Sequence, residues 1–311
     1  MTPSSTLFRS LVASMVMSAI VLWGIDRKIE NMTLNVTSGE IGKINILLED
    51  QIEVPLSFWG SSTTLVHVDP SIVDSITGVN AFNFGLDGTF FMQYSGFLKS
   101  FCQRNDSSVI AIGLNLTDFH PRGQIYHPQY YIHALDDPNV KGALYCIDPY
   151  LTWKMHRIPF YRFVLNGSMD YLHLRQNQKS DSTLISSKGY AGQNKFGTNE
   201  DFGKFHYDSI EIHRPFVDSL IAIVSELKAS GHRPIFFVSP MYTTAFMQIK
   251  NIRDFHDVLK EIQEAGFPVL DLTDSPISKD RNMFYNYLHM NKYGAEAFSQ
   301  ELSFRMLQYL E

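Results

Sequence analysis

Cysteine is almost absent from this 311-residue sequence, in which only Cys102 and Cys146 occur. Two cysteines are too few for a disulfide scaffold or for a zinc site with four cysteine ligands. They could pair in an oxidising compartment or remain free thiols, and the sequence leaves both possibilities open. Runs of basic residues are also lacking and the formal net charge is −6, which argues against a nucleic-acid partner.

Metal-site spacing is missing as well. The sequence has histidines, but they show no paired arrangement such as His-x-x-x-His with a carboxylate. The histidines considered are His67, His120, His127, His133 and His156. We therefore expect no metal and no other cofactor, and a metal-dependent phosphoesterase is disfavoured.

One long uncharged run is present, and it lies at the N-terminus. Residues 10–25 carry no charge, Arg9 precedes them, and Asp26-Arg27-Lys28 follows. Crossing a bilayer takes about 17–25 apolar residues, so the run suffices if its flanks join it and Arg9 snorkels. No small-x-small cleavage site follows. This favours a retained membrane anchor over residues 1–25, rather than a removed signal peptide or a buried core helix.

The residues behind this run indicate where a folded domain begins. Residues 26–41 are polar and aperiodic, which is typical of a linker. We expect residues 42–311 to form one domain that faces the periplasm or the cell exterior. The basic residues around the run are too balanced to fix this orientation by themselves.

Apolar and amphipathic segments alternate through the predicted domain. Four short apolar segments, bounded by turn residues, are typical of strands buried on both faces: 54–59, 109–113, 234–238 and 268–272. Amphipathic stretches predict helices at 70–76, 212–230, 249–265 and 292–310. The alternation predicts an α/β fold with a mostly parallel sheet between helices. Residues 120–210 fit it poorly, and we expect them to form an insertion over the carboxyl edge of the sheet, where such folds bind ligands.

The stretch FWGSSTTL, residues 58–65, joins the first predicted strand to a helix-like segment. A serine here has its hydroxyl at the ligand-binding edge, near helix amides that favour negative charge. The competing interpretation is a helix N-cap, for which Ser and Thr are preferred, and the local sequence alone favours the cap. A nucleophilic serine also needs a base. His289, in FYNYLHMNKYGA just before the last predicted helix, is the candidate.

Taken together, Gly60-Ser61-Ser62 and Asn286-x-x-His289 resemble motifs of the SGNH (GDSL-like) hydrolase superfamily. In that superfamily the last residue of Gly-Asp-Ser is the nucleophile, and Asp-x-x-His supplies the acid and the base. The resemblance implies Ser62 as nucleophile, His289 as base and Asn286 in the position of the acid. It also implies a flavodoxin-like three-layer sandwich.

Two intermediate motifs match in the same order. Gly85 in NAFNFGLDG corresponds to a glycine after the second strand, and Gly113 and Asn115 in AIGLNLTDF correspond to a Gly-x-Asn after the third. The resemblance implies that the amides of Ser62 and Gly85 and the side chain of Asn115 bind the oxyanion. It also places Gly113 among the oxyanion- and substrate-binding residues. Taken singly, the glycines are also ordinary turn residues and Asn115 is also a turn-capping side chain.

Gly-Ser-Ser in place of Gly-Asp-Ser is closer to one branch of that superfamily. Its members include the D-alanine transfer protein of teichoic acid synthesis and alginate O-acetylation proteins, and GKINILLED before the first strand also looks like this branch. These proteins are membrane-anchored or exported and move acyl groups on envelope polymers with a membrane-bound O-acyltransferase. The resemblance therefore implies a membrane-anchored serine esterase or O-acyltransferase that acts on acyl esters, above all acetyl esters, of a cell-envelope polysaccharide.

Asn286 departs from the superfamily pattern. An amide orients the histidine ring but brings no charge, and the equivalent change in a serine protease costs about 10⁴ in turnover. Three acids of the preceding loop could substitute: Asp271, Asp274 or Asp280. The alternative function is a catalytically weak or inactive protein with this fold, which binds carbohydrate or serves as a scaffold for a membrane O-acyltransferase.

Overall fold

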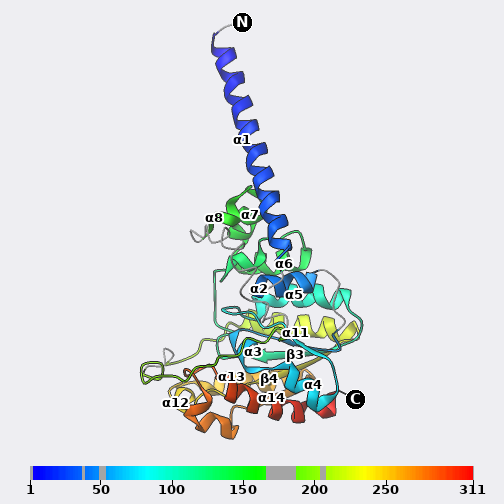
Figure 1. Ribbon diagram of the computed structural model, residues 1–311, viewed down its shortest axis with the longest axis vertical. Coiled ribbons are helices and arrows are strands. Elements are labelled where there is room, and N and C mark those ends of the chain that lie inside the picture. The colour runs from blue at the N-terminus through cyan, green and yellow to red at the C-terminus, as the bar shows by residue number, and fades with distance from the viewer. Residues whose placement is uncertain (1–2, 37–38, 49–53, 166–186, 204–207, 311) are drawn as a thin grey trace.

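Five parallel strands form the centre of the structure, a computed structural model that describes residues 3–36, 39–48, 54–165, 187–203 and 208–310 (Figure 1). In chain order the strands are β1 (Leu56–Trp59), β2 (Ala81–Asn83), β3 (Val109–Leu114), β4 (Arg233–Val238) and β5 (Val269–Asp271). They lie side by side in the order β2-β1-β3-β4-β5, and every neighbouring pair is parallel. The predicted fold class and the four predicted strands are confirmed. The sequence pattern missed β2, because three residues are too few to carry a hydrophobic period.

Burial separates the inner strands from the edge. Every residue of β1 and β3 is buried, as expected for parallel strands covered on both faces. The prediction was wrong for β5, whose residues are partly buried or exposed. The reason is topological, because β5 is the edge strand of the sheet and pairs only with β4.

The helices and short 3-10 turns fill the connections. In chain order the helices are α1 (Pro3–Leu34), α2 (Gly39–Leu48), α3 (Ser62–His67), α4 (Pro70–Thr77), α5 (Phe91–Arg104), α6 (Pro138–Ile147), α7 (Pro149–Arg157), α8 (Tyr161–Val164), α11 (Arg214–Ala229), α12 (Thr243–Phe246), α13 (Ile252–Glu264) and α14 (Lys292–Met306). The 3-10 turns are Pro128–Tyr131, Pro276–Lys279, Arg281–Met283 and Leu307–Tyr309. The four predicted helices correspond to α4, α11, α13 and α14, whereas the sequence pattern did not indicate α5.

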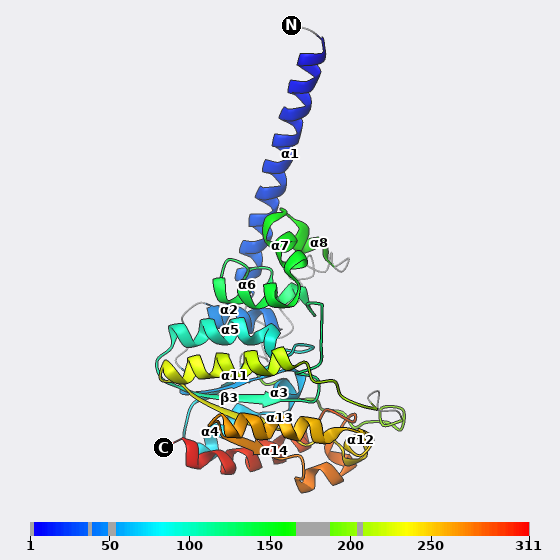
Figure 2. The same cartoon turned by 180° about the vertical axis from the view of Figure 1, so that it is seen from behind.

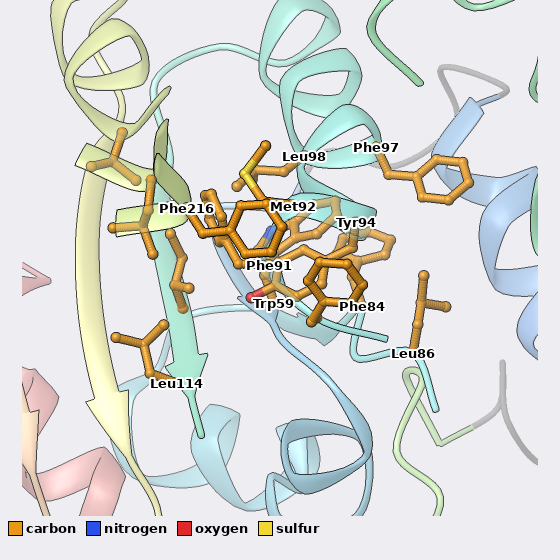
Figure 3. Packing of buried hydrophobic residues seen from close by; sticks show 14 of the residues in the cluster. Trp59, Phe84, Leu86, Phe91, Met92, Tyr94, Phe97, Leu98, Leu114 and Phe216 are labelled. Carbon is orange, nitrogen blue, oxygen red and sulfur yellow. The ribbon is translucent and has the colours of Figure 1, made fainter. Parts of the chain in front are cut away.

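Helices cover both faces of the sheet (Figure 1, Figure 2). Side chains alternate along β1: Trp59 belongs to the core shared with α5 and α11, and Phe58 to the core shared with α4 and α14. Figure 3 shows Trp59, Phe84, Phe91 and Phe216 among the residues of the first of these cores. The rings of Trp59 and Phe84 stack with centroids 4.8 Å apart. The two-sided core therefore holds the ends of β1 and β3 rigidly.

The N-terminal helix α1 is a candidate membrane anchor, because Thr6–Leu34 is long and apolar enough to cross a membrane (Figure 1). Its polar end differs from the prediction. Residues 26–41 were expected to form an irregular linker, yet residues 26–34 continue the helix. The reason is ion pairing, since Asp26 and Glu30 lie 2.6 and 3.2 Å from the guanidinium of Arg162 in α8. Residues 37–38 lie outside the described residues.

The predicted insertion, residues 120–210, divides into two parts. Arg122 lines a cavity at the carboxyl edge of the sheet, and the N–H of Ala191 donates to the carbonyl of Leu65 in α3. Helices α6, α7 and α8 lie elsewhere, stacked beyond α5 and beside α1 (Figure 2). Gly96 permits this close approach, because a Cβ there would lie 2.5 Å from the Cα of Val140 in α6. Residues 166–186 and 204–207 of this insertion lie outside the described residues.

The order of the strands determines where a ligand can bind. The chain leaves β1 toward β2 on one side of the sheet and continues to β3 on the other. The crevice between the carboxyl ends of β1 and β3 is therefore the topological switch point, where open α/β sheets bind ligands. The segments that follow these two strands carry Ser62 and Asn115.

Candidate active site

Ser62, His289 and Asn286 form a continuous chain of hydrogen bonds. Ser62 Oγ lies 2.8 Å from His289 Nε2, and His289 Nδ1 lies 3.1 Å from Asn286 Oδ1. The same Oδ1 accepts the backbone N–H groups of Leu288 and His289, so it acts as an acceptor. Nδ1 must therefore carry the ring proton and donate it, which leaves the Nε2 lone pair facing the Ser62 hydroxyl. Residues 227 positions apart thus meet as a nucleophile and a base do.

The N-cap interpretation applies to neither serine. Ser61 stands at the N-cap position of α3, but its side chain makes no capping hydrogen bond. Its Oγ instead accepts a hydrogen bond of 2.8 Å from Asn115 Nδ2. Ser62 is the first residue of α3, so its hydroxyl is not placed to cap the helix. Both serines therefore face the crevice.

Close packing between β1, α3 and β3 sets the position of Ser62. A Cβ at Gly60 would lie 2.0 Å from Thr64 Oγ1, and one at Gly113 would lie 2.3 Å from the same atom. Both positions must be glycine for the first turn of α3 to lie against β3. Gly113 was predicted to assist substrate binding; it lies instead beneath α3 and does not line the cavity described below. Its contribution is to packing.

The side chain of Asn115 is fixed by its neighbours. Its Oδ1 accepts hydrogen bonds from the backbone N–H and the hydroxyl of Thr117. The amide NH₂ group consequently points toward Ser61, and one of its two hydrogens remains for another acceptor. Asn115 thus donates a hydrogen bond to the neighbour of Ser62 and lines the same cavity as Ser62, and its role at the oxyanion stays a prediction.

A buried carboxylate supports this loop. Asp118 is completely buried, and its two oxygens accept the backbone N–H groups of Asn115 and Phe91 at 2.7 and 2.9 Å. Burial raises the pKa of Asp118 to about 6, although both hydrogen bonds act in the opposite direction. Sequence reasoning missed this residue. The Asn-x-x-Asp spacing after β3, which is suited to a side chain-stabilised turn, was the available signal.

Gly85 does not occupy the predicted role. Its N–H donates to Asn83 Oδ1 at 2.8 Å, and its carbonyl accepts from Lys43 Nζ at 2.8 Å. The amide hydrogen is therefore already in use, and Gly85 does not line the cavity. Gly88 and Thr89, a few residues further along the same loop, do line it. The correct loop was predicted, but which of its residues reach the cavity depends on the hydrogen bonds of Asn83.

A cavity of about 220 Å³ opens beside Ser62 and His289. Most of its remaining wall is apolar: Leu114, Leu116, Val238, Met241, Phe246 and Leu288. Arg122 supplies a positive charge, and its guanidinium lies 5.0 Å from the ring centroids of both Phe90 and Tyr126. The sequence placed Arg122 within the insertion without indicating a role.

A second histidine holds another hydroxyl in this wall. His67 is fully buried, its Nε2 accepts the N–H of Met290, and its Nδ1 lies 2.9 Å from Ser239 Oγ. Nδ1 therefore donates, and the Ser239 hydroxyl hydrogen is left for another acceptor. Burial, with the nearby His289, lowers the pKa of His67 well below its usual value, so the ring is neutral. Ser239 directly follows β4, and this place at the carboxyl edge of the sheet was the available signal for it.

The surroundings of His289 favour its neutral form. Burial lowers the pKa of His289 to about 4, while the charge of Asp87 raises it and that of Lys195 lowers it to a lesser extent. Tyr285 stacks on the imidazole at a centroid distance of 5.5 Å. A neutral ring at pH 7 is the form that can accept a proton from Ser62.

The three alternative acids do not contact His289 in the part of the chain that the structure describes. Asp271 accepts from Thr273, and Asp280 accepts from the N–H of Asn282. Asp274 is exposed. The oxygen that orients the ring is that of Asn286.

Among the described residues, the cysteines and the acidic side chains form no second candidate site. Cys102 is free and buried and Cys146 is free and exposed, so neither takes part in a disulfide. Burial raises the pKa of Cys102 to about 12, which keeps it a protonated, unreactive thiol. Among the described residues, no three His, Cys, Asp or Glu side chains gather as metal ligands do.

Comparisons with known proteins add little to this geometry. No family model matches the sequence, and no curated protein matches it. Among solved structures, a protein from Streptococcus pneumonia, provisionally described as a platelet activating factor, matches with a TM-score of 0.44 and 11% sequence identity. The match covers 98% of this chain and 99% of the other. A likeness this weak carries no argument about function, so any functional conclusion depends on the site itself.

Proposed function

We propose that this protein is a serine ester hydrolase or O-acyltransferase of the SGNH type. The observation that carries the proposal is the 2.8 Å contact between Ser62 Oγ and the unprotonated Nε2 of His289, at the mouth of the cavity. A hydroxyl becomes a competent nucleophile when a base within hydrogen-bond reach takes its proton. Asn286 holds the ring in the tautomer that this requires.

The reaction proceeds in two stages. His289 takes the proton of Ser62 as Oγ attacks the ester carbonyl, and then gives it to the leaving alkoxide. The developing oxyanion is stabilised by the Ser62 amide at the start of α3 and by the free hydrogen of Asn115 Nδ2. Loss of one such donor costs about 10²–10³ in rate. In the second stage, water or a sugar hydroxyl attacks the acyl-enzyme, giving hydrolysis or acyl transfer respectively.

The apolar cavity and the candidate anchor support the choice of substrate. The largely apolar wall of the cavity suits an acyl group, and the guanidinium of Arg122 suits a polar or negatively charged part of the same molecule. Helix α1 would hold the domain at a membrane, facing the periplasm or cell exterior. We therefore propose acyl esters of a cell-envelope polysaccharide as substrates, and a membrane-bound O-acyltransferase as a possible partner.

The retention of α1 is supported by its packing. The helix continues without a break from its apolar part into the segment that pairs with Arg162. Removal of the apolar part as a signal peptide would cut this helix beside a buried ion pair. A retained anchor is the simpler interpretation.

Labelling with a fluorophosphonate probe tests the nucleophile. Wild type should label, whereas Ser62→Ala should not label and should lose acetyl-ester turnover with nearly unchanged thermal stability. His289→Ala should lose the same activity, and the double variant should be no worse than either single one, because members of a catalytic unit are non-additive.

Ser61→Ala is the matched control from the same turn. Its hydroxyl contacts Asn115 rather than His289, so this variant should still label. Labelling that disappears in Ser61→Ala but persists in Ser62→Ala would contradict the proposal.

The uncharged Asn286 favours a second candidate, a non-catalytic carbohydrate-binding or scaffold protein with the same fold. Without a negative charge beside His289, the imidazolium that forms during catalysis is less stable. Absence of labelling and of turnover in the wild type, together with binding of a polysaccharide, would support this second function.

A further inference from the structure

Helix α7 carries an exposed aromatic face. Tyr150 and Trp153 lie three residues apart on the helix and are 69% and 47% exposed, and Ile158 just beyond the helix is 39% exposed. The opposite face is ordinary core, with Thr152 and Met155 buried. Helix α7 is therefore already packed on one side, and its large apolar side chains on the other side leave much of their surface exposed among the described residues.

The position of this face along α1 is fixed by contacts. The N–H of Phe160, at the start of α8, donates to Asp26 Oδ1 at 2.8 Å, and Arg162 pairs with the same carboxylate. Both views show α7 and α8 beside the lower part of α1, as the portion of the body that reaches furthest toward the N-terminus (Figure 1, Figure 2). The contacts with Asp26 thus fix the position of α7 and α8 along the length of α1.

The same residue marks the end of the apolar span. About 20 residues from Thr6 to Ile25, each rising 1.5 Å, cover the ~30 Å of a hydrocarbon core. Asp26 is the first charged residue after them, and the exposed Trp23 precedes it by less than one helical turn. The boundary between lipid and water therefore falls at the height of α7 and α8.

The composition of the face suits that boundary. Lys154 and Arg157 accompany the aromatic residues, and Lys154 Nζ lies 4.0 Å from the ring centroid of Tyr150. Tyrosine and tryptophan are enriched at membrane interfaces, and basic side chains there contact lipid phosphates. Two independent observations, the chemistry of this face and its position along α1, therefore indicate the same contact, which is with lipid headgroups.

We propose that the α7 face, defined as Tyr150, Trp153, Lys154, Arg157 and Ile158, rests in the headgroup region of the membrane that α1 crosses. The inference rests on the proposed anchoring by α1 and goes beyond it. An anchor alone leaves free the tilt of α1, and of the body attached to it, relative to the bilayer, whereas a second contact beside the anchor fixes that tilt. The crevice with Ser62 is then held at a set orientation to the bilayer.

Tryptophan quenching in lipid vesicles tests the contact. The chain has three tryptophans: Trp23 in the span, Trp59 in the core with no exposure, and Trp153. Full-length Trp23→Phe, reconstituted into phosphatidylcholine–phosphatidylglycerol vesicles, reports on Trp153 when the lipids are brominated. Interfacial side chains lie ~5–10 Å into the boundary, so bromine near the headgroup should quench about twofold more than bromine at the chain end.

A matched variant separates the signals. Trp23→Phe/Trp153→Phe retains only Trp59, and brominated lipid should leave its emission unchanged. If brominated lipid also leaves the emission of Trp23→Phe unchanged, the contact is overturned, and the α7 face is left to a protein partner.

Failure of the anchor itself gives a different result. If α1 spans the bilayer, the protein must float with the vesicles. In Trp153→Phe, which retains Trp23, brominated lipid must then quench the emission of Trp23. A chain that does not float overturns both the anchoring and the α7 contact. Flotation with quenched Trp23 but unquenched Trp153 overturns the contact alone.

Discussion

The oxygen of Asn286 has three hydrogen-bond donors around it: two backbone N–H groups and the ring of His289. This environment would accommodate a carboxylate as well as an amide, because each donor would also stabilise a negative charge. Replacing this amide by a carboxylate would therefore change the charge beside the base and keep the oxygen that orients its ring. Its chemistry can be changed with little change of shape.

Asn286→Asp should raise the pKa of His289, because an adjacent carboxylate favours the imidazolium form. Ester hydrolysis should accelerate about tenfold, well below the ~10⁴ of the reverse change in a serine protease. Turnover and melting temperature are measured together, since a new charge in a partly buried place also costs stability. Unchanged turnover, with loss of activity on replacing Asp271, Asp274 or Asp280, would mean that another residue supplies the acid.

The pH profile provides a second readout of the same ring. The pKa of His289 is lowered to about 4, so the protonated, inactive form appears only at acid pH. In the wild type, kcat/KM should stay constant down to about pH 5 and then fall as the base is protonated. In Asn286→Asp this acid limb should move to higher pH. A wild-type limb near the ordinary histidine pKa of ~6.5 would contradict the desolvation of the ring.

At the scale of elements, Thr64 occupies the space between α3 and the end of β3. Its hydroxyl fills the positions that side chains at Gly60 and Gly113 would take. The sheet and the first turn of α3 therefore fit together only with glycine at both places. This packing aligns Ser62 with Asn115 across the crevice.

Gly113→Ala should destabilise the fold by about 1–3 kcal/mol, the usual cost of overpacking a core. Its Cβ would lie 2.3 Å from Thr64 Oγ1 and 2.7 Å from Phe237 Cζ. Thr64→Ala should remove part of this cost, so the double variant should be more stable than the two single effects predict. Denaturant unfolding measures the cycle.

Gly142→Ala in α6 is the matched control. A Cβ at Gly142 meets nothing within 4 Å. Because alanine is the better helix former, this variant should gain about 0.5–1 kcal/mol. A similar gain from Gly113→Ala would show that the close packing at Thr64 is not a constraint.

At the scale of the whole molecule, α1 and the body share one buried ionic cluster. Arg162, Asp26 and Glu30 are all buried, and the guanidinium contacts both carboxylates. A second contact fixes the turn after α1, because Asn45 Nδ2 donates to the carbonyls of Thr33 and Val36. The helix and the body therefore behave as one unit.

Arg162→Met should lower the stability of the full-length protein by about 3–5 kcal/mol, because it removes the ion pair of the buried Asp26 carboxylate and leaves the buried Glu30 carboxylate with Arg27 alone. Neutralising them as well, with Asp26→Asn and Glu30→Gln, should recover much of this loss. Thermal unfolding in detergent measures both. Lys99→Ala breaks the more exposed pair with Glu226 and should cost under about 1 kcal/mol. Equal effects of Arg162→Met and Lys99→Ala would contradict a buried cluster.

The local sequence determined the strand–helix alternation, and with it the α/β class and the carboxyl edge as the place for a site. Hydrophobic runs such as residues 109–113 indicate a buried strand from their own composition. Ser62 and His289 could be considered as site candidates from their places after a strand and before a helix, whereas Asn115, and the pairing of Ser62 with His289, came from the resemblance to superfamily motifs. The strand and helix patterns are local, so the chain encodes them without reference to distant residues.

Only the tertiary structure decided which of these candidates meet and which atoms are free. Gly85 lies in the predicted loop, yet its amide is taken by Asn83, and the buried His67 acts through hydrogen bonds to remote segments that no local spacing reveals. The polar residues 26–34 continue the helix, and Arg162, more than a hundred residues later, pairs with Asp26 and Glu30 of this segment. The physical reason is the same in each case. Hydrogen bonds and ion pairs depend on distances of a few ångströms between segments remote in sequence, and only packing fixes those distances.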